Sequence, residues 1–205
     1  IEMCSHYEMP SLKEIKTYLK TDLKLPLVVS KNIEDKFESV TQIYPKSPSL
    51  VMLYSDDELK LVEKKWGYPS PFKKNRVIYN ARVERFYEEK PSMWDDSFAR
   101  QRCIILANEF WESSKQTYLA SNNKTYHEHS SFTAKDEPMA LIAGIYKGDD
   151  FSMVTTASND TVLPVHERMP LVLKPSELRR WLFQNFTSLL DRSEYNLNRH
   201  HLPHR

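Results

Sequence analysis

The apolar positions near the start of the chain repeat at helical spacing. Ser11 and Glu14 form a capping-box pair, in which each side chain bonds the backbone of the other residue at a helix N-terminus. The apolar residues Leu12, Ile15, Leu19 and Leu23 follow at intervals of three or four, so the spacing predicts a helix over residues 11–23. Pro26 disfavours helical geometry at the residue before it, and we expect the helix to end near Lys24.

Further along, short runs of apolar and β-branched residues predict strands. They cover residues 50–54, 59–66, 77–82, 103–107, 139–146 and 151–156, and alternating polar and aromatic residues over 113–138 predict a hairpin. Helices are expected over 92–100 and from Pro175 onward, and the His- and Arg-rich residues after about 192 are expected to be loose. Many short strands with few helices indicate an α+β fold. We expect a single domain with a curved, barrel-like, mostly antiparallel sheet and a few flanking helices.

Composition excludes several classes of protein. The 205 residues are 40% hydrophobic, enough for a sizeable core, and 29 Lys and Arg against 28 Asp and Glu exclude a histone-like binder while permitting a local basic groove. Three glycines leave no Gly-rich phosphate-binding loop, which disfavours NTPases and Rossmann oxidoreductases. No apolar run reaches the roughly 18 residues of a membrane span. The absence of a signal-peptide pattern and the two cysteines predict a reducing cytoplasm.

Cys4 directly follows Met3 and is the first candidate for chemistry. In a chain trimmed to Cys4, an α-amine with a pKa of about 7.7–8.0 would stand next to a thiol. Such a pair attacks an aldehyde through the amine to give an imine, and the thiol then closes a thiazolidine ring. While residues remain ahead of Cys4, its nitrogen is an amide and cannot react in this way. An inert cysteine is the alternative, and Cys103, inside an apolar run, is predicted to be one.

Asn80, Arg82 and Glu84 alternate along a β-rich segment. Strand geometry points these three side chains to one face. An arginine on such a face suits phosphate contacts, because its guanidinium forks onto phosphate oxygens. A solvated sheet face explains the same pattern equally well.

Two more segments offer acid–base groups. Glu112 lies beside Trp111, and partial desolvation there would raise its pKa and suit it to proton transfer. His166 lies close to Arg168 in a Pro-bounded segment, where a histidine can act as an acid or base beside an anion clamp. A solvated carboxylate and a structural histidine are the alternatives.

Taken together and in order, these segments resemble the SOS-response-associated peptidase (SRAP) family, the abasic-site processing proteins. The resemblance departs from the family pattern at Ser5-His6, where the family has Gly-Arg, and at Asn108-Glu109-Phe110, where it has Asp-Gly-Phe. It implies an SRAP-like domain over 3–190, with 1–2 as a tag remnant or pro-segment and 191–205 as a loose tail. The segments that carry it are Met3-Cys4, Trp66-Gly67-Tyr68-Pro69, Asn80-Ala81-Arg82-Val83-Glu84, Arg102-Cys103-Ile104-Ile105, Phe110-Trp111-Glu112, Thr155-Thr156-Ala157-Ser158-Asn159 and His166-Glu167-Arg168-Met169-Pro170.

The resemblance implies a DNA-damage response protein that binds single-stranded DNA and crosslinks covalently to abasic sites, with autoproteolytic peptidase activity. In this reading Cys4 supplies the amine and thiol that form a thiazolidine with the sugar aldehyde. Glu112 assists sugar ring opening and proton transfer, and His166 shuttles protons. Asn80 holds the Cys4 amine or the sugar.

The resemblance also implies a set of DNA contacts. Arg82 and Arg168 would grip phosphates, with Arg85, Arg100 and Arg102 near the same groove, and Trp66 and Tyr68 would stack on bases. The remaining predicted DNA contacts are His6, in place of an arginine, Thr155 and Thr156. No metal and no other cofactor is expected. We expect a cytoplasmic monomer, associated with the nucleoid when bound to DNA and with no membrane partner.

Two other functions stay open on the sequence. One is a thiol peptidase acting mainly on peptide bonds, with Cys4 and His166 as nucleophile and base. The other is a non-catalytic binder of single-stranded DNA, in which Cys4 plays no part. An abasic oligonucleotide separates the three functions. A denaturant-resistant crosslink supports the first, peptide turnover the second, and reversible binding alone the third.

Overall fold

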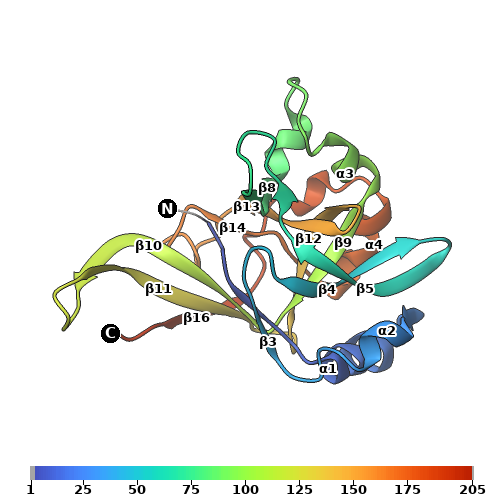
Figure 1. Ribbon diagram of the computed structural model, residues 1–205, viewed down its shortest axis with the longest axis horizontal. Helices are drawn as coiled ribbons and strands as arrows, with labels where there is room; N and C mark the ends of the chain where they lie inside the picture. The colour runs from blue at the N-terminus through green and yellow to red at the C-terminus, as the bar shows by residue number, and fades with distance from the viewer. Residues whose placement is uncertain (1–2, 205) are drawn as a thin grey trace.

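Five strands close into a small barrel in the computed structural model, which describes residues 3–204 (Figure 1). The expectation for residues 1–2 lies outside the described residues. The strands are β4 (Pro48–Ser55), β5 (Glu58–Trp66), β9 (Arg102–Ala107), β12 (Ala140–Lys147) and β13 (Asp150–Ala157). They pair in the order β13-β12-β9-β4-β5, and β5 pairs again with β13. All these pairings are antiparallel except the last, so the predicted barrel-like, mostly antiparallel sheet is confirmed.

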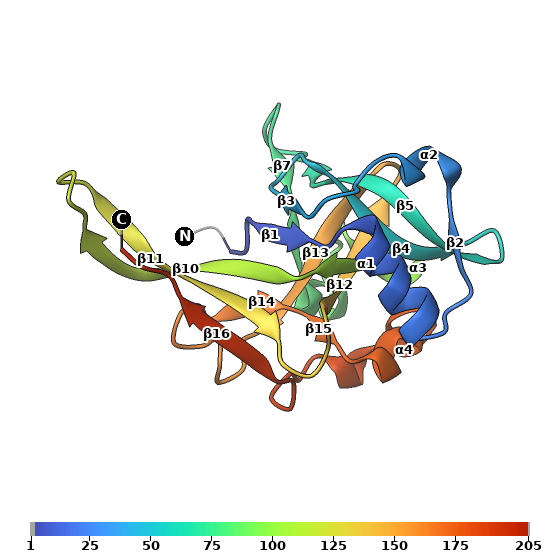
Figure 2. The same cartoon turned by 90° about the horizontal axis from the view of Figure 1, so that it is seen from below.

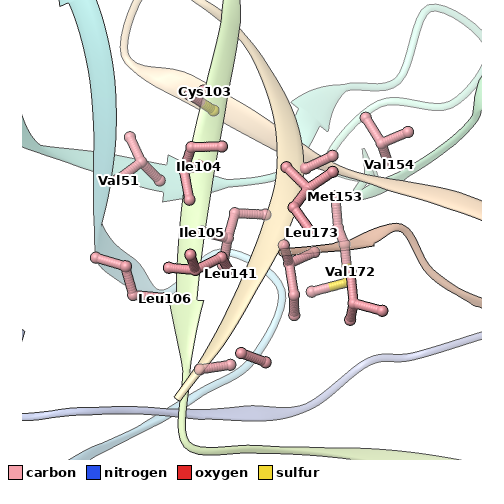
Figure 3. Close-up of a cluster of buried hydrophobic side chains, with 14 of the residues drawn as sticks. Val51, Cys103, Ile104, Ile105, Leu106, Leu141, Met153, Val154, Val172 and Leu173 are labelled. Carbon is pink, nitrogen blue, oxygen red and sulfur yellow. The ribbon is translucent and has the colours of Figure 1, made fainter. Parts of the chain in front are cut away.

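The apolar runs of the sequence form the barrel wall. The side chains of residues 103–107 on β9 and 140–145 on β12 are all buried, so both faces of these strands are covered. Figure 3 shows Ile104, Ile105 and Leu141 among the packed side chains of the neighbouring strands. A continuous apolar run bounded by polar residues is the pattern expected of a strand buried on both faces.

A second sheet lies against the barrel, in the order β16-β11-β10-β1-β3. It contains β1 (Tyr7–Met9), β3 (Thr41–Ile43) and the predicted hairpin, which is β10 (Glu109–Leu119) with β11 (Thr125–Ala134). The hairpin projects from the body of the molecule (Figures 1 and 2). A predicted feature is corrected here, because part of the expected loose tail is strand β16 (Leu197–His201), paired with β11. The sequence shows no strand pattern here, because only Leu197 of the five side chains is buried, as expected of an exposed edge strand.

The predicted helices are present with shorter bounds. The first begins as α1 (Leu12–Lys16) with the expected capping box and continues as a π-helical stretch, η1 (Thr17–Asp22). The others are α3 (Asp95–Arg100), α4 (Leu178–Phe183) and the short α2 (Lys31–Glu34), together with the 3₁₀ turns η2 (Val83–Tyr87), η3 (Pro175–Glu177) and η4 (Thr187–Leu189). Within residues 3–204, no helix has the length and apolar character needed to cross a membrane.

Short strands around β13 bring distant parts of the chain together. The strand β8 (Asn80–Arg82) runs parallel to β13, with Asn80 opposite Met153. The strand β14 (Arg168–Pro170) runs antiparallel to β13, with Arg168 opposite Ala157. The segments that contain Asn80 and Arg168 therefore meet along β13. The remaining short strands are β2 (Leu27–Val29), β6 (Tyr68–Pro69), β7 (Val77–Ile78) and β15 (Val172–Leu173).

Candidate active site

The Met3–Cys4 peptide bond is held at both ends by predicted site residues. The Cys4 amide donates a hydrogen bond to Glu112 Oε2 over 3.0 Å. Asn80 Nδ2 donates to the carbonyl oxygens of Met3, at 2.6 Å, and of Cys4, at 3.1 Å. Strand pairing brings Cys4 to Glu112. The strand β1 pairs with β10, and just beyond the paired residues the Trp111 amide donates a hydrogen bond to the His6 carbonyl. Three of the four predicted catalytic residues thus lie in direct contact.

The Glu112 carboxyl is buried on the inner face of β10, with its residue 1% exposed. Burial raises the pKa of Glu112 to about 8, and the hydrogen bond from the Cys4 amide lowers it only in part. At neutral pH the group is therefore mostly protonated and able to give a proton. This is the desolvated carboxyl predicted from the Trp111-Glu112 pair.

Two buried oxygen atoms beside Cys4 accept no hydrogen bond from any residue in the described part of the chain. They are Glu112 Oε1 and Asn80 Oδ1. Leaving a buried polar atom unpaired costs roughly 1–3 kcal/mol. A bound molecule that forms hydrogen bonds with both atoms would recover this cost, so the pair marks a polar position next to the cysteine.

The Cys4 thiol is protonated in this state of the protein. Its residue is 1% exposed, and burial together with the nearby Glu112 raises the pKa of Cys4 well above its usual value. The Sγ atom lies 3.7 Å from the His6 carbonyl oxygen. Because the thiolate is the nucleophilic form, reaction at this sulfur requires a base.

Arg168 belongs to a neighbouring cluster built on β13 and β14. Its guanidinium donates two hydrogen bonds to Glu84, at 2.7 and 2.8 Å, and others to Thr155 Oγ1 and to the Thr155 carbonyl. Burial opposes ionisation of Glu84, yet the bonds and charge of Arg168 hold the pKa of Glu84 below its usual value. The guanidinium is engaged with this carboxylate, and the Arg168 side chain is 9% exposed. The predicted phosphate grip by Arg168 is therefore not available in this structure.

Thr155 and Thr156 are also buried, at 0% and 2% exposed. The Thr156 hydroxyl donates to the Leu190 carbonyl over 2.8 Å. Both side chains pack inside the protein along β13, so their position does not favour the predicted DNA contacts.

His166 lies beside this second cluster, just before β14. The His166 Nδ1 atom lies 3.0 Å from the Arg168 amide nitrogen and 3.2 Å from the Arg168 carbonyl oxygen, so both backbone groups hold this edge of the ring. The residue is 9% exposed and is fixed by the turn that precedes it, where its own amide donates to Val162. The structure thus orients the His166 ring, and the proton-shuttle role remains a prediction.

Trp66 and Tyr68, predicted to stack on bases, are core residues. Trp66 is fully buried, donates from Nε1 to the Tyr79 carbonyl and packs edge-on against Tyr7. The Tyr68 hydroxyl is hydrogen-bonded to Ser97, and the residue is 3% exposed. The physical reason is that Trp66 ends β5 at the seam where this strand meets β13. Neither ring offers a face to a base.

A different aromatic surface lies next to Cys4. The His6 ring is stacked between Tyr44, with centroids 4.4 Å apart, and Trp111, with centroids 4.1 Å apart. We call these three side chains the stacked platform. They line a cavity of about 600 Å³ whose other walls include Ser5 and the hairpin residue His129. No local pattern points to Tyr44, since only the pairing of β3 with β1 brings it to His6.

The five arginines expected around the groove differ in their pairing. Arg82 is exposed on β8 and makes no side-chain hydrogen bond or ion pair to another residue within 3–204. Arg85 is paired with Glu88 and Arg100 with Asp96, whereas Arg102 donates to the Gln184 carbonyl. Among these five, Arg82 is the cation left to meet a phosphate.

Comparison with known proteins identifies relatives of this chain. Its sequence is 25% identical over 152 residues to the abasic site processing protein YedK of Escherichia coli, covering 71% of this chain and 65% of that protein. It is 25% identical over 165 residues to the abasic site processing protein YoqW of Bacillus subtilis, covering 73% and 69%. The chain thus spans just under two thirds of the length of the first relative.

Two solved structures have the same fold. A protein from Bacteroides thetaiotaomicron matches with a TM-score of 0.72 and 19% identity, over 98% of this chain and 92% of that one. A protein from Bordetella bronchiseptica matches with a TM-score of 0.66 and 18% identity, over 98% and 100%. The family model described as SOS response associated peptidase (SRAP) matches residues 3–200, which confirms the resemblance seen in the sequence. The chain belongs to the SRAP family.

Proposed function

We propose that this protein binds single-stranded DNA, processes abasic sites and, once trimmed to Cys4, forms a thiazolidine crosslink with the abasic sugar. The names of its relatives support abasic-site processing as the activity. The observation that carries the proposal is the 3.0 Å hydrogen bond between the Cys4 nitrogen and the buried Glu112 carboxyl. It sets an acid–base group beside the atom that would attack the aldehyde.

The chemistry uses two nucleophiles and one acid. The free Cys4 amine adds to the aldehyde carbon of the ring-opened sugar and loses one water to give an imine. The thiol then adds to the same carbon, its proton passes to nitrogen, and the five-membered ring closes. Protonated Glu112 gives its proton to the departing oxygen, while Asn80 accepts a hydrogen bond from a sugar hydroxyl at Oδ1. His166, which lies beside the neighbouring Arg168 cluster, passes protons between the reacting groups and solvent.

The same contacts suit hydrolysis of the Met3–Cys4 bond, which would free the amine. Addition of water to the Met3 carbonyl places negative charge on its oxygen, where Asn80 Nδ2 already donates over 2.6 Å. Glu112 lies at the departing Cys4 nitrogen and can protonate it. The products are a carboxylate on Met3 and an amine on Cys4. This step supports the peptidase part of the proposal.

The strand would approach over the stacked platform of Tyr44, His6 and Trp111. Stacking of one base on an aromatic ring contributes about 1–3 kcal/mol and tolerates every base. Arg82 would contact a phosphate, because its guanidinium is exposed. We place the flanking nucleotide in the cavity beside the platform.

The decisive experiment uses an abasic single-stranded oligonucleotide and scores adduct that survives denaturation. Three proteins are compared. The first is the chain of residues 1–205, shown by its intact mass to be untrimmed, the second is the chain that begins at Cys4, and the third is that trimmed chain with Cys4→Ala. We expect a stable adduct from the trimmed protein alone. A stable adduct from protein of verified untrimmed mass would show that the Cys4 amine is not the nucleophile. Peptide turnover without an adduct would support the thiol-peptidase alternative.

Binding is tested separately through its salt dependence. Release of condensed counterions makes the logarithm of affinity for single strands fall with log salt by about 0.7 for each contacted phosphate. Arg82→Ala should reduce this slope by about 0.7, whereas Arg100→Ala should leave it unchanged because Arg100 is paired with Asp96. Equal slopes for all three proteins would remove Arg82 from the DNA surface.

A further inference from the structure

The hairpin and the C-terminal strand bring three metal-ligand side chains together, away from Cys4. Glu128 lies on β11, His201 on β16 and His204 just after it, and one ligand atom of each lies within 4.8 Å of the other two. The register accounts for the first pair. His201 is opposite Ser130, so Glu128, two residues from Ser130, shares its face of the sheet. Figure 2 shows β16 running along β11, with the C-terminus beside the hairpin.

Neighbouring contacts hold the third ligand in position. The His204 ring is stacked on Tyr118, with centroids 3.9 Å apart and planes 6° from parallel. His204 Nε2 lies 3.4 Å from Glu128 Oε1, and the rings of His201 and His204 are 6.1 Å apart. The cluster is partly assembled by protein packing, so a bound ion would have little ordering entropy left to overcome.

We propose that Glu128, His201 and His204 form a binding site for a divalent transition metal of the zinc class. Two imidazoles and one carboxylate are ligands that Zn²⁺ takes in proteins, with a fourth position left for water. Ca²⁺ and Mg²⁺ fit less well, because both prefer sites made wholly of oxygen atoms. This proposal replaces the expectation of no metal site. No local pattern in the sequence predicts the site, because the carboxylate comes from a distant strand.

The site is distinct from the Cys4 cluster. His201 is opposite Ser130 on β11, and Ser130 is opposite Glu112 on β10. Two strand spacings, about 10 Å, therefore separate the backbones at Glu112 and His201. The ion would tie β16 and the residues after it to the projecting hairpin. Its effect is structural: it stiffens the arm whose base carries Trp111 and Glu112.

The test is a calorimetric titration of metal-free full-length protein with Zn²⁺, in a Cys4→Ala background that removes the thiol of the candidate active site as a competing ligand. We expect one ion per chain, and an affinity about tenfold or more lower in both His204→Ala and Glu128→Gln. His200→Ala is the matched control. It removes a histidine whose Nε2 lies 3.2 Å from the Thr133 hydroxyl and which pairs opposite Ser131, so it should bind as the parent does.

A second readout separates a specific site from scattered surface binding. Saturating Zn²⁺ should raise the melting temperature of the parent and of His200→Ala, because an ion that binds only the folded state stabilises it. The shift should disappear in His204→Ala, whose circular dichroism should match the parent because the side chain is exposed. Absence of saturable binding in the parent, or binding in both ligand variants as tight as in the parent, would overturn the proposal.

Discussion

Two buried cysteines in one small domain have opposite surroundings. Each is 1% exposed or less, and burial raises the pKa of both thiols. Cys103 lies in the wall of the barrel among apolar side chains (Figure 3), and its carbonyl accepts a hydrogen bond from Trp181 Nε1 over 2.9 Å. Cys4 lies where β1 meets β10, with its amide on Glu112 and its carbonyl held by Asn80.

The difference shows that burial alone does not make a cysteine reactive or inert. At Cys103 the neighbours are satisfied and apolar, so burial produces a small hydrophobic side chain. At Cys4 the same burial acts on a carboxyl as well, raising its pKa to about 8 and turning it into an acid at neutral pH. Within residues 3–204, Glu112 Oε1 and Asn80 Oδ1 have no hydrogen-bond partner, and both remain for a bound molecule.

The largest expected effect separates two single variants of the trimmed protein, Cys4→Ala and Cys103→Ala. Cys4→Ala should abolish the denaturant-resistant adduct, because the thiol that closes the ring is lost and the imine that the remaining α-amine can form is readily hydrolysed, while reversible strand binding stays. Cys103→Ala should leave the amount of adduct unchanged. Both are read from gels of an abasic oligonucleotide. Loss of the adduct in well-folded Cys103→Ala would move the chemistry to the barrel and undo the comparison.

The next largest effect is expected from Glu112→Gln in the trimmed protein. Loss of a general acid should slow adduct formation by about 100 to 10,000-fold. In the trimmed parent the rate should fall at high pH, once the carboxyl gives up its proton. The glutamine variant should lack this limb of the profile. A time course of adduct at several pH values measures both. An identical pH profile in the variant would exclude Glu112 as the titrating group.

Folding stability offers a third test of the Glu112 environment. The usual pKa is 4.5 and the folded value is about 8, so between these values the native state binds more protons than the unfolded state. Stability should therefore fall as the pH rises through this window, by up to about 1.4 kcal/mol per pH unit from this group. In Glu112→Gln the same window should be flatter. Urea unfolding at about pH 5, 6, 7 and 8 gives the slope of the unfolding free energy against pH for the parent and for Glu112→Gln. Glu109→Gln serves as the control, because Glu109 is more exposed.

Much of this comparison follows from sequence, and part of it does not. The apolar run around Cys103 predicted a core strand, and the Trp111-Glu112 pair predicted a desolvated acid, because both signals are local. Burial of Trp66 and assembly of the stacked platform depend on which strands pair, which no local pattern fixes. Strand β16 was missed for a related reason. Its exposed polar side chains resemble a tail, and its pairing with β11 makes it a strand.

The smallest expected effect tests how tightly the surroundings of Cys103 are packed. Gly144 lies opposite Cys103 in the β9–β12 ladder, and a Cβ placed on it would lie 2.9 Å from the Cys103 sulfur and 3.2 Å from Ile105 side-chain atoms. Gly144→Ala should therefore cost about 1–3 kcal/mol of unfolding free energy through overpacking. Cys103→Ala alone should cost about 1 kcal/mol, as for a lost methyl-sized group.

Combined, these two changes should be less destabilising than the sum of their separate costs, because removal of the sulfur makes room for the new methyl group. A coupling of about 0.5–3 kcal/mol is expected from a double-mutant cycle by urea unfolding. Cys4→Ala is the matched control, since Cys4 lies in the other environment. Its effect should add to that of Gly144→Ala within about 0.5 kcal/mol. If the effects of Gly144→Ala and Cys103→Ala on the unfolding free energy were also additive, the barrel wall would have to shift to accommodate the new methyl group. The two thiols would then differ less in packing than in their polar neighbours.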